Sequence, residues 1–297
     1  MKHKQTITIL GSLIAVLSAI TSLLGIFSND GSGPFQYESI RGRMVDIYGK
    51  GIYHHMSADV AIQGIAQDYV TLFIGVPLLL VSLVGFRKQL IHHHFLLSGT
   101  LGYFLVTFLF YTSMAMFNIM FLAYVLLMGL SFFALFLTLR SFEYSRIAEY
   151  FSSKTPTGFV GWFLIINSIL IAFLWLNIIV PPLIQGTIYP PELNHYTTLI
   201  VQGFDLGLLL PISFIVGLFL IKKKPMGYLY ATTYIIFLSI LMTALTAKII
   251  AMAINGVNVV PVVFIIPSIN IITIISAFLM IKNIQIKKFK EYKNTTT

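Results

Sequence analysis

The sequence predicts an all-α membrane protein with eight transmembrane helices and both chain ends in the cytoplasm. Composition, the lengths of the apolar stretches and the positions of the basic residues all support this fold class. The 297-residue chain is 57% hydrophobic and 10% charged, with a mean hydropathy of +0.89. This balance is far from that of soluble globular domains.

Eight apolar stretches have the length needed to cross a membrane, which is about 20 residues for a helix. They cover residues 7–27, 66–86, 95–117, 119–139, 159–181, 198–221, 227–253 and 260–281. Lipid cannot satisfy backbone hydrogen bonds, and the stretches lack the alternating pattern of a barrel strand, so each predicts a helix.

Basic residues gather in alternate gaps between these stretches. The gaps assigned to the cytoplasm hold 15 of the 19 Lys and Arg residues: Lys2, Lys4, Arg87, Lys88, Arg140, Arg146, Lys154, Lys222, Lys223, Lys224, Lys282, Lys287, Lys288, Lys290 and Lys293. The opposite gaps hold Arg41, Arg43 and Lys50. Because basic residues stay on the cytoplasmic side, this pattern fixes the orientation. The net charge is +9, and we expect the basic residues to interact with the anionic headgroups of the lipid bilayer and not with nucleic acid.

The first stretch follows Lys2 and Lys4 and could also begin a secretory signal peptide. Its apolar run exceeds the usual 7–15 residues, and no A-x-A site precedes Ser28, so we interpret it as a retained signal anchor. The chain contains no Cys, which excludes disulfides, thiolate metal sites and thiol catalysis.

Three connecting loops are long enough to carry structure. In the outer loop 28–65, apolar segments 44–48 and 52–53 flank a glycine-containing turn, which predicts a small β-hairpin. The second outer loop covers 182–197. The inner loop 140–158 alternates charged and aromatic residues and predicts an amphipathic cytoplasmic helix on the headgroups.

The two halves of the chain resemble each other in order, which suggests two parallel four-helix repeats. Gln67-Asp68, Pro77 and Arg87-Lys88 recur as Gln202 with Asp205, Pro211 and Lys222–Lys224. Four spans per half give both halves the same direction through the membrane. We therefore divide the chain into a first half (1–139, with the outer loop), the linker 140–158, and a second half with a basic tail (159–297).

Some of these segments resemble a group of bacterial multi-span membrane proteins of about eight helices. The resemblance rests on 47–53, on Ala66-Gln67-Asp68, on 196–207 and on 224–228, about a third of the chain. That group has no assigned activity. The resemblance therefore implies a bacterial plasma membrane and no particular chemistry.

Asp205 and Lys248 are the sharpest candidates for a functional site. Each lies inside an apolar span, where a charge is costly unless it is paired, protonated or hydrated. Their spans run antiparallel, and the two residues lie at comparable depth, so an ion pair between them is geometrically plausible. The pair could lock two helices together or form the charged lining of a substrate or proton site.

Asp68 lies at the predicted start of its span, where a carboxylate can cap a helix. Alternatively, Asp68 and Gln67 could line an outward-facing pocket opposite Gln202 and Asp205.

Outer-loop His54, His55, Asp59 and His195 are the right types of ligand for a metal, but their spacing matches no metal motif. We expect no metal site and no cofactor.

Three functions stay open. The leading hypothesis is a permease or binding protein for a small solute or ion, with its pocket open to the outside. The second is an accessory or sensor subunit that uses loop 28–65 to bind an unspecified protein partner. The third is an intramembrane enzyme acting on a lipid. No nucleophile or nucleotide motif supports catalysis, so an enzyme is the least favoured.

Overall fold

The structure, a computed structural model, describes residues 3–187 and 189–285. Its helices are α1 (Lys4–Phe27), α2 (Ala58–Val70), α3 (Val76–Arg87), α4 (Ile91–Met114), α5 (Phe121–Arg140), α6 (Thr157–Ile184), α7 (Ile200–Phe204), α8 (Leu210–Ile221), α9 (Pro225–Ile254) and α10 (Val262–Lys282). The strands are β1 (Phe35–Glu38) and β2 (Met44–Ile47). Short 3₁₀ helices form η1 (Gly51–Tyr53), η3 (Tyr144–Tyr150) and η4 (Pro191–Leu193), and π-helical turns form η2 (Thr71–Gly75) and η5 (Asp205–Leu209).

The described residues contain eight helical segments that are long and apolar enough to cross a membrane, as the sequence predicts. Two of the spans are interrupted by π-turns: α2, η2 and α3 form one span, and α7, η5 and α8 form another. This protein is therefore a multi-pass membrane protein. Its longest spans, Ala58–Arg87 and Pro225–Ile254, each contain 30 residues.

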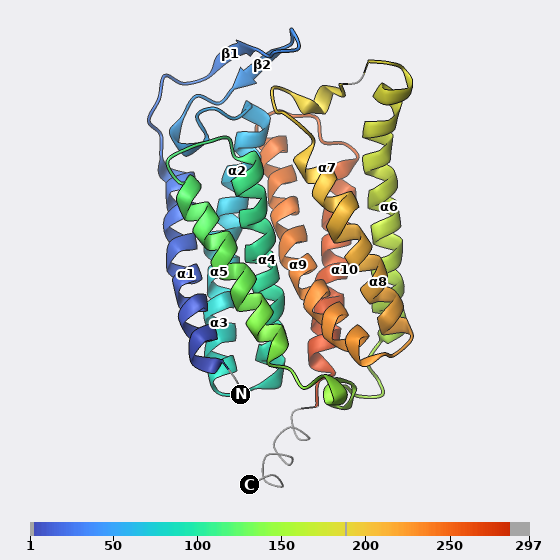
Figure 1. The fold of residues 1–297 in the computed structure, drawn as a ribbon. Helices are drawn as coiled ribbons and strands as arrows, with labels where there is room; N and C mark the ends of the chain where they lie inside the picture. The colour runs from blue at the N-terminus through green and yellow to red at the C-terminus, as the bar shows by residue number, and fades with distance from the viewer. Residues whose placement is uncertain (1–2, 188, 286–297) are drawn as a thin grey trace.

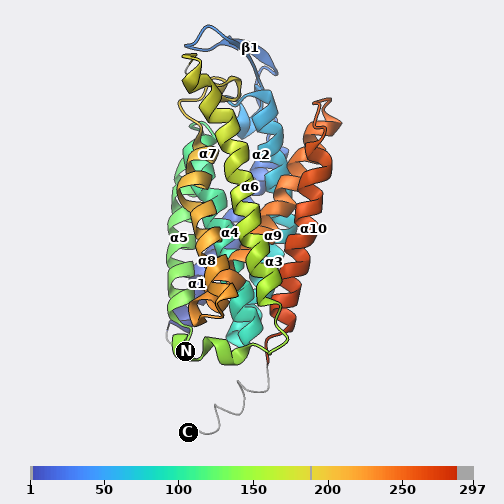
Figure 2. The same cartoon turned by 90° about the vertical axis from the view of Figure 1, so that its right-hand side faces the viewer.

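The eight spans stand side by side in one bundle (Figure 1). On one side α3 and α5 pack against α4, and α1 packs against α3 and α5. On the other side α8 and α10 pack against α9, and α6 packs against α8. Helices α4 and α9 pack against each other at the middle, and α9 also contacts α2. The second view shows α6 and α10 reaching past the level at which α5 ends (Figure 2).

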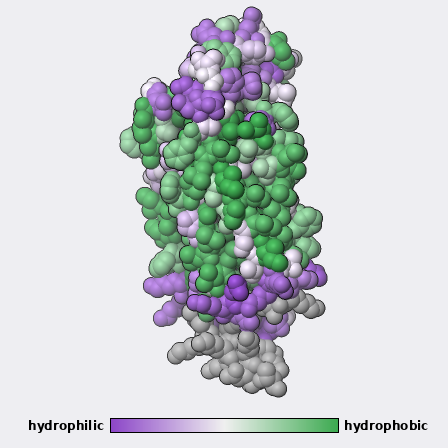
Figure 3. Space-filling view, turned by 90° about the vertical axis from the view of Figure 1, so that its left-hand side faces the viewer, coloured by the Kyte–Doolittle hydropathy of each residue, from purple (hydrophilic) through white to green (hydrophobic). Residues whose placement is uncertain are grey.

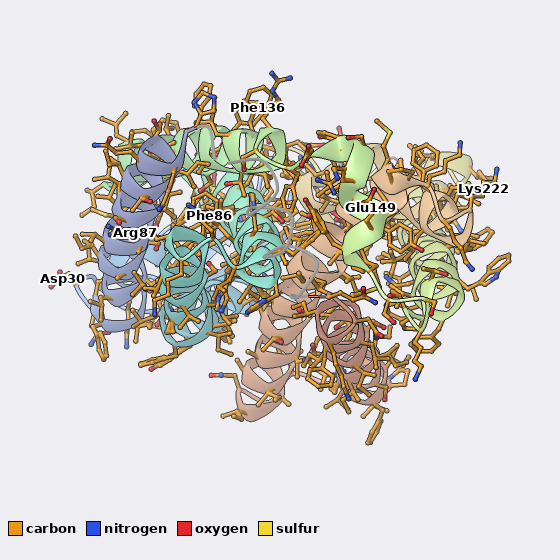
Figure 4. The ribbon with its side chains drawn as sticks, turned by 90° about the horizontal axis from the view of Figure 1, so that it is seen from below. Asp30, Phe86, Arg87, Phe136, Glu149 and Lys222 are labelled. Carbon is orange, nitrogen blue, oxygen red and sulfur yellow. The ribbon has the colours of Figure 1, made fainter. Side chains whose placement is uncertain are left out.

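One face of the bundle is apolar around its middle and polar at both ends. Figure 3 shows a broad hydrophobic band between two hydrophilic zones. We call the zone with β1 and β2 the hairpin end and the opposite zone the basic end. Figure 4 looks onto the basic end, where Arg87 and Lys222 lie toward opposite edges and Glu149 of η3 lies between them. An apolar belt of this kind suits a hydrocarbon environment.

The predicted β-hairpin exists, but its strands are different ones. Phe35–Glu38 pairs with Met44–Ile47, so the strand predicted after the glycines is wrong. Gly49 and Gly51 both have positive φ (71° and 54°) and turn the chain away from the sheet instead of across it. The segment Gly51–Tyr53 then forms η1 and buries Tyr53 in the bundle.

Two loop boundaries also differ from the prediction. The second span begins at Ala58 and not at residue 66. The polar segment with Gln63 and Gln67 is helical and packs inside the protein, so the helix continues through it. In the linker, the helix is the 3₁₀ segment Tyr144–Tyr150, and Ile147 and Tyr150 are buried beneath the bundle. The predicted tail lysines Lys287, Lys288, Lys290 and Lys293, like Lys2, lie outside the described residues.

Candidate charged site inside the helix bundle

Asp68 is a buried carboxylate held by two tyrosines. Its side chain is 1% exposed and lies well inside α2, so the predicted role as a helix cap is wrong. The Tyr53 hydroxyl donates to Oδ2 at 2.5 Å, and the Tyr111 hydroxyl donates to Oδ1 at 2.9 Å. Both carboxylate oxygens therefore have a donor, as a buried acid requires.

Tyr53 brings the hairpin end into contact with this carboxylate. Burial, followed by the nearby charge of Asp68, raises the pKa of the Tyr53 phenol well above its usual value of 10.0. The phenol consequently stays protonated and continues to donate. Helix α1 approaches from the other side, where a methyl group added to Gly25 would overlap the Asp68 carboxylate.

Gln67 belongs to a neighbouring network and not to the Asp68 site itself. Its Nε2 donates to the Tyr103 hydroxyl at 2.8 Å and to Thr107 Oγ1 at 3.2 Å, and the Tyr103 hydroxyl lies 2.8 Å from Thr71 Oγ1. Gln67 is 3% exposed, and its Oε1 has no hydrogen-bond partner within the described chain. This network joins α2 to α4.

Asp205 occupies the first position of the π-turn η5 and is half-buried. The indole Nε1 of Trp175, on α6, donates to its Oδ2 at 2.8 Å. Oδ1 receives no hydrogen bond from any described residue. The glycines on either side, Gly203 and Gly207, face open space, so this GxxxG pair does not serve as a close helix crossing.

Lys248 lies on α9 between the two acids. It interacts electrostatically with both, and its interaction with Asp68 is stronger than that with Asp205. The predicted Lys248–Asp205 ion pair is not a direct one, because the ion pairs within 4.0 Å among residues 3–187 and 189–285 are those of Arg146 with Glu143 and Glu149. One lysine thus lies in the field of a carboxylate from each half of the bundle, without touching either.

Helix packing explains this position. Helix α9 contacts α2 on one side and α8 on the other, so Lys248 faces the spans that carry Asp68 and Asp205. It is half-buried, and its ammonium makes no hydrogen bond to a described residue. Charges inside a protein interact more strongly than they do in water, because the effective dielectric constant is lower.

Gln202 precedes Asp205 by three residues and shares its helix face. It is half-buried, and no described residue accepts from or donates to its side chain. Of the predicted site residues, the structure therefore brings Asp68, Lys248 and Asp205 into one electrostatic cluster, with Gln202 beside it, and places Gln67 in a separate network. Sequence reasoning missed Tyr53, Tyr111 and Trp175, because nothing in their local sequence marks them as partners of an acid.

His195 helps to hold the two loops at the hairpin end together. Within the described chain, no group of three or more His, Cys, Asp or Glu side chains could hold a metal ion. The His195 ring instead lies with Nε2 3.0 Å from the carbonyl oxygen of His55.

Arg41 strengthens the connection between these loops. Its guanidinium donates to the carbonyl oxygens of Tyr196 at 2.9 Å and Asn194 at 3.3 Å, and lies over the Tyr189 ring. The Tyr196 hydroxyl lies 3.2 Å from Ser57 Oγ, and burial raises the pKa of this phenol. We call these contacts the hairpin-end clamp. It fastens the hairpin end of the first half to the loop before α7.

An open groove of about 360 Å³ lies at the basic end, far from the charged cluster. Leu80, Val81, Val84, Gly85, Lys88, Leu90 and His93 line it. Its walls are mostly apolar and belong to the membrane-facing side of α3 and the start of α4. It contains none of the intramembrane charges.

Comparisons with protein-family models, with curated proteins and with solved structures returned no match for this chain. The multi-pass architecture is therefore established by the structure, and any activity has to be argued from the charged cluster. Membership of the bacterial group that the sequence resembles stays a prediction.

Proposed function

We propose that this protein is a permease or binding protein for a small solute or ion, with its site at the Asp68, Lys248 and Asp205 cluster. The observation that carries the proposal is Lys248, an intramembrane ammonium that lies between two acids and directly contacts neither in the described chain. Ionisable side chains inside the membrane are expensive, and they commonly mark a pathway for a substrate or a proton. A structural lock would be expected to pair them directly.

The position of the cluster favours access from the hairpin end. Both charged residues lie toward the hairpin end of their spans. Asp205 lies five residues after the first residue of α7, and Lys248 lies six residues before the last residue of α9. Both side chains are half-buried. The hairpin-end clamp lies on the hairpin side of this region, and Tyr53 links the hairpin end directly to Asp68. The hairpin therefore acts as a lid in this proposal.

A parallel repeat supplies two halves that can move against each other. The π-turns η2 and η5 end two residues before Pro77 and Pro211, respectively. The turns that follow at the basic end match as well. Gln89 follows Pro77 at the same distance along the chain as Lys223 follows Pro211, and both residues have positive φ (60° and 51°). In this register Asp205 corresponds to Thr71, not to Asp68. The two acids are therefore not repeat equivalents, and the site is asymmetric.

The distribution of charge suggests the orientation. Arg87, Lys222 and the other basic residues concentrated at one end favour the cytoplasmic side, which places the hairpin end outside. The resemblance to the bacterial group points to the plasma membrane of a bacterium.

Reconstitution in liposomes tests the proposal. Fluxes of protons, alkali cations, organic acids and amino acids are measured for the wild type, Lys248→Met and Asp205→Asn. We expect the wild type to pass at least one of these species. Both variants should lower that flux by about tenfold or more, because losing one hydrogen bond to a charged group costs about 1.5–3 kcal/mol.

Asp46→Asn provides the matched control, because Asp46 is an exposed carboxylate on β2. It should transport like the wild type. The permease is refuted if wild-type liposomes pass none of these species, or if both variants elute as folded protein in size-exclusion chromatography and transport normally.

A second candidate function is an accessory subunit, and the hairpin favours it. Ile40 and Met44 at the hairpin turn are 89% and 58% exposed. Large apolar side chains exposed together on a polar end are typical of a protein contact. In this case Ile40→Ser with Met44→Ser should break co-purification with a partner and leave liposome flux, if present, unchanged.

A further inference from the structure

We propose that the ligand of the charged cluster is a small zwitterion, with its carboxylate bound by Lys248 and its ammonium group bound by Asp205. This inference rests on the proposed function and names the substrate class for that site. It rests on a difference between the charged side chains: some have hydrogen-bond partners among the described residues, and others have none there.

Asp68 has no free capacity for a direct charged contact. Tyr53 donates to one of its oxygens and Tyr111 to the other, and the side chain is almost entirely buried. Gly25 closes it off on the side of α1, where not even a methyl group fits. Asp68 therefore offers no contact surface to a ligand.

Lys248 and Asp205 are in the opposite situation. The ammonium of Lys248 carries three N–H donors, and none meets an acceptor in the described residues. Oδ1 of Asp205 also lacks a donor there, whereas Oδ2 is held by Trp175. Both side chains keep some accessible surface. The site thus offers one unpaired cation and one anion with a free oxygen.

These two charges lie more than 4.0 Å apart, so they do not satisfy each other. A lone anion would meet Lys248 and leave Asp205 Oδ1 without a donor, and a lone cation would meet Asp205 and leave the Lys248 donors without an acceptor. Leaving a charged group unsatisfied inside a membrane-spanning segment is costly. A molecule that carries both groups satisfies both side chains together.

Trp175 adds orientation. Its indole N–H fixes one oxygen of Asp205 from α6, which leaves Oδ1 as the acceptor for the ligand. Gln202 lies on the same face one turn earlier, and its amide, which makes no hydrogen bond to a described residue, can bind a neighbouring polar group. Recognition by two opposite charges at a fixed separation selects for the spacing between the carboxylate and the ammonium of the ligand.

Binding to purified protein in detergent tests the inference. Isothermal titration calorimetry compares glycine, β-alanine and γ-aminobutyrate, which separate the two charges progressively, with acetate and methylamine, which carry one charge each. We expect at least one zwitterion to bind. Acetate and methylamine should bind about tenfold more weakly or worse, because each forms only one of the two charged contacts.

Four variants locate the binding. Lys248→Met and Asp205→Asn should each abolish the zwitterion signal, while the exposed controls Lys88→Met and Asp46→Asn should retain it. The inference is overturned if the wild type binds none of the three zwitterions, if acetate or methylamine binds as tightly as the best of them, or if folded Asp205→Asn binds like the wild type. The single-charge comparison is made on the wild type, so it does not depend on variant folding.

The results also separate this inference from the proposed function. Cation or proton flux that depends on Asp205, without zwitterion binding, refutes the zwitterion and keeps the permease. Zwitterion binding that depends on Lys248, without any flux, keeps the ligand class and restricts the protein to a binding role.

Discussion

Asp68 and Gly25 together form the tightest contact of the charged cluster. The carboxylate is fixed by two phenols and lies directly against the backbone of α1. This is a contact that only glycine permits, because any Cβ at position 25 would occupy the space of the carboxylate. The helix that the sequence marks as a possible signal anchor therefore contributes directly to the interior of the bundle.

Gly25→Ala should destabilise the protein strongly. Overpacking a well-packed interior typically costs about 1–3 kcal/mol, and here the displaced group is a buried acid with two donors. We expect a clear drop in the melting temperature in detergent. Gly129→Ala is the matched control, because a Cβ at Gly129 in α5 meets nothing within 4 Å. It should be neutral or slightly stabilising, since alanine is the better helix former.

A double mutant identifies the cause of the Gly25→Ala effect. Asp68→Ala removes the group with which the new methyl would collide, so Gly25→Ala should cost much less in that background than in the wild type. An equal cost in both backgrounds would show that the carboxylate is not what Gly25 accommodates.

The hairpin-end clamp joins the hairpin to the loop before α7. Arg41 donates to two carbonyl oxygens of a segment more than 150 residues away along the chain. Main-chain carbonyls are the acceptors, so the contact depends on the path of the backbone as well as on the sequence. An arginine suits this role, because its planar group offers several donors at once.

Arg41→Ala should loosen this clamp. Hydrogen exchange at Phe35–Ile47 and Pro191–Tyr196 should become about tenfold faster, since hydrogen bonds from a charged donor contribute about 1.5–3 kcal/mol. Mass spectrometry of exchanged peptides measures the effect. Arg43→Ala changes an exposed arginine of the same hairpin and should leave the exchange unchanged. If exchange is equally slow in Arg41→Ala, the clamp does not hold the loops together.

Transport would require the two halves of the bundle to move against each other at the hairpin end. Phe110 on α4 and Phe204 on α7 are in contact across the halves, with ring centroids 5.9 Å apart. The chain has no native Cys, so introduced cysteines are the sole thiols and can be cross-linked without background. This pair is therefore a direct probe of the movement.

Cross-linking Phe110→Cys to Phe204→Cys with a short bifunctional thiol reagent should abolish the liposome flux, and a cleavable reagent should restore it on reduction. Phe117→Cys with Phe121→Cys is the matched control, since these rings lie 5.3 Å apart within one half. That cross-link should leave the flux unchanged. Undiminished flux with the Phe110–Phe204 link in place would exclude relative movement of the halves at this point.

The number of spans and the positions of the intramembrane charges follow from the sequence. The length of an apolar stretch and the positions of Lys and Arg can be read directly along the chain, and lipid allows few alternatives to a helix. The prediction of eight spans is confirmed. Asp205 and Lys248 stand out in the sequence because a charge in hydrocarbon is costly wherever the helices pack. The sequence predicts the hairpin but not its strands, because a glycine turn can reverse a chain or redirect it, and local sequence alone does not distinguish these outcomes.

Only the tertiary structure decided how the charges are satisfied. Tyr53 comes from η1 at the hairpin end, and Tyr111 and Trp175 come from two different helices. No local sequence signal shows which acceptor a phenol or indole donor will meet. The π-turns, the tight approach of Gly25 and the position of Lys248 between two acids likewise depend on how helices pack. Length and hydropathy are properties of each segment by itself, whereas pairing is a property of side chains that meet only after the bundle has formed.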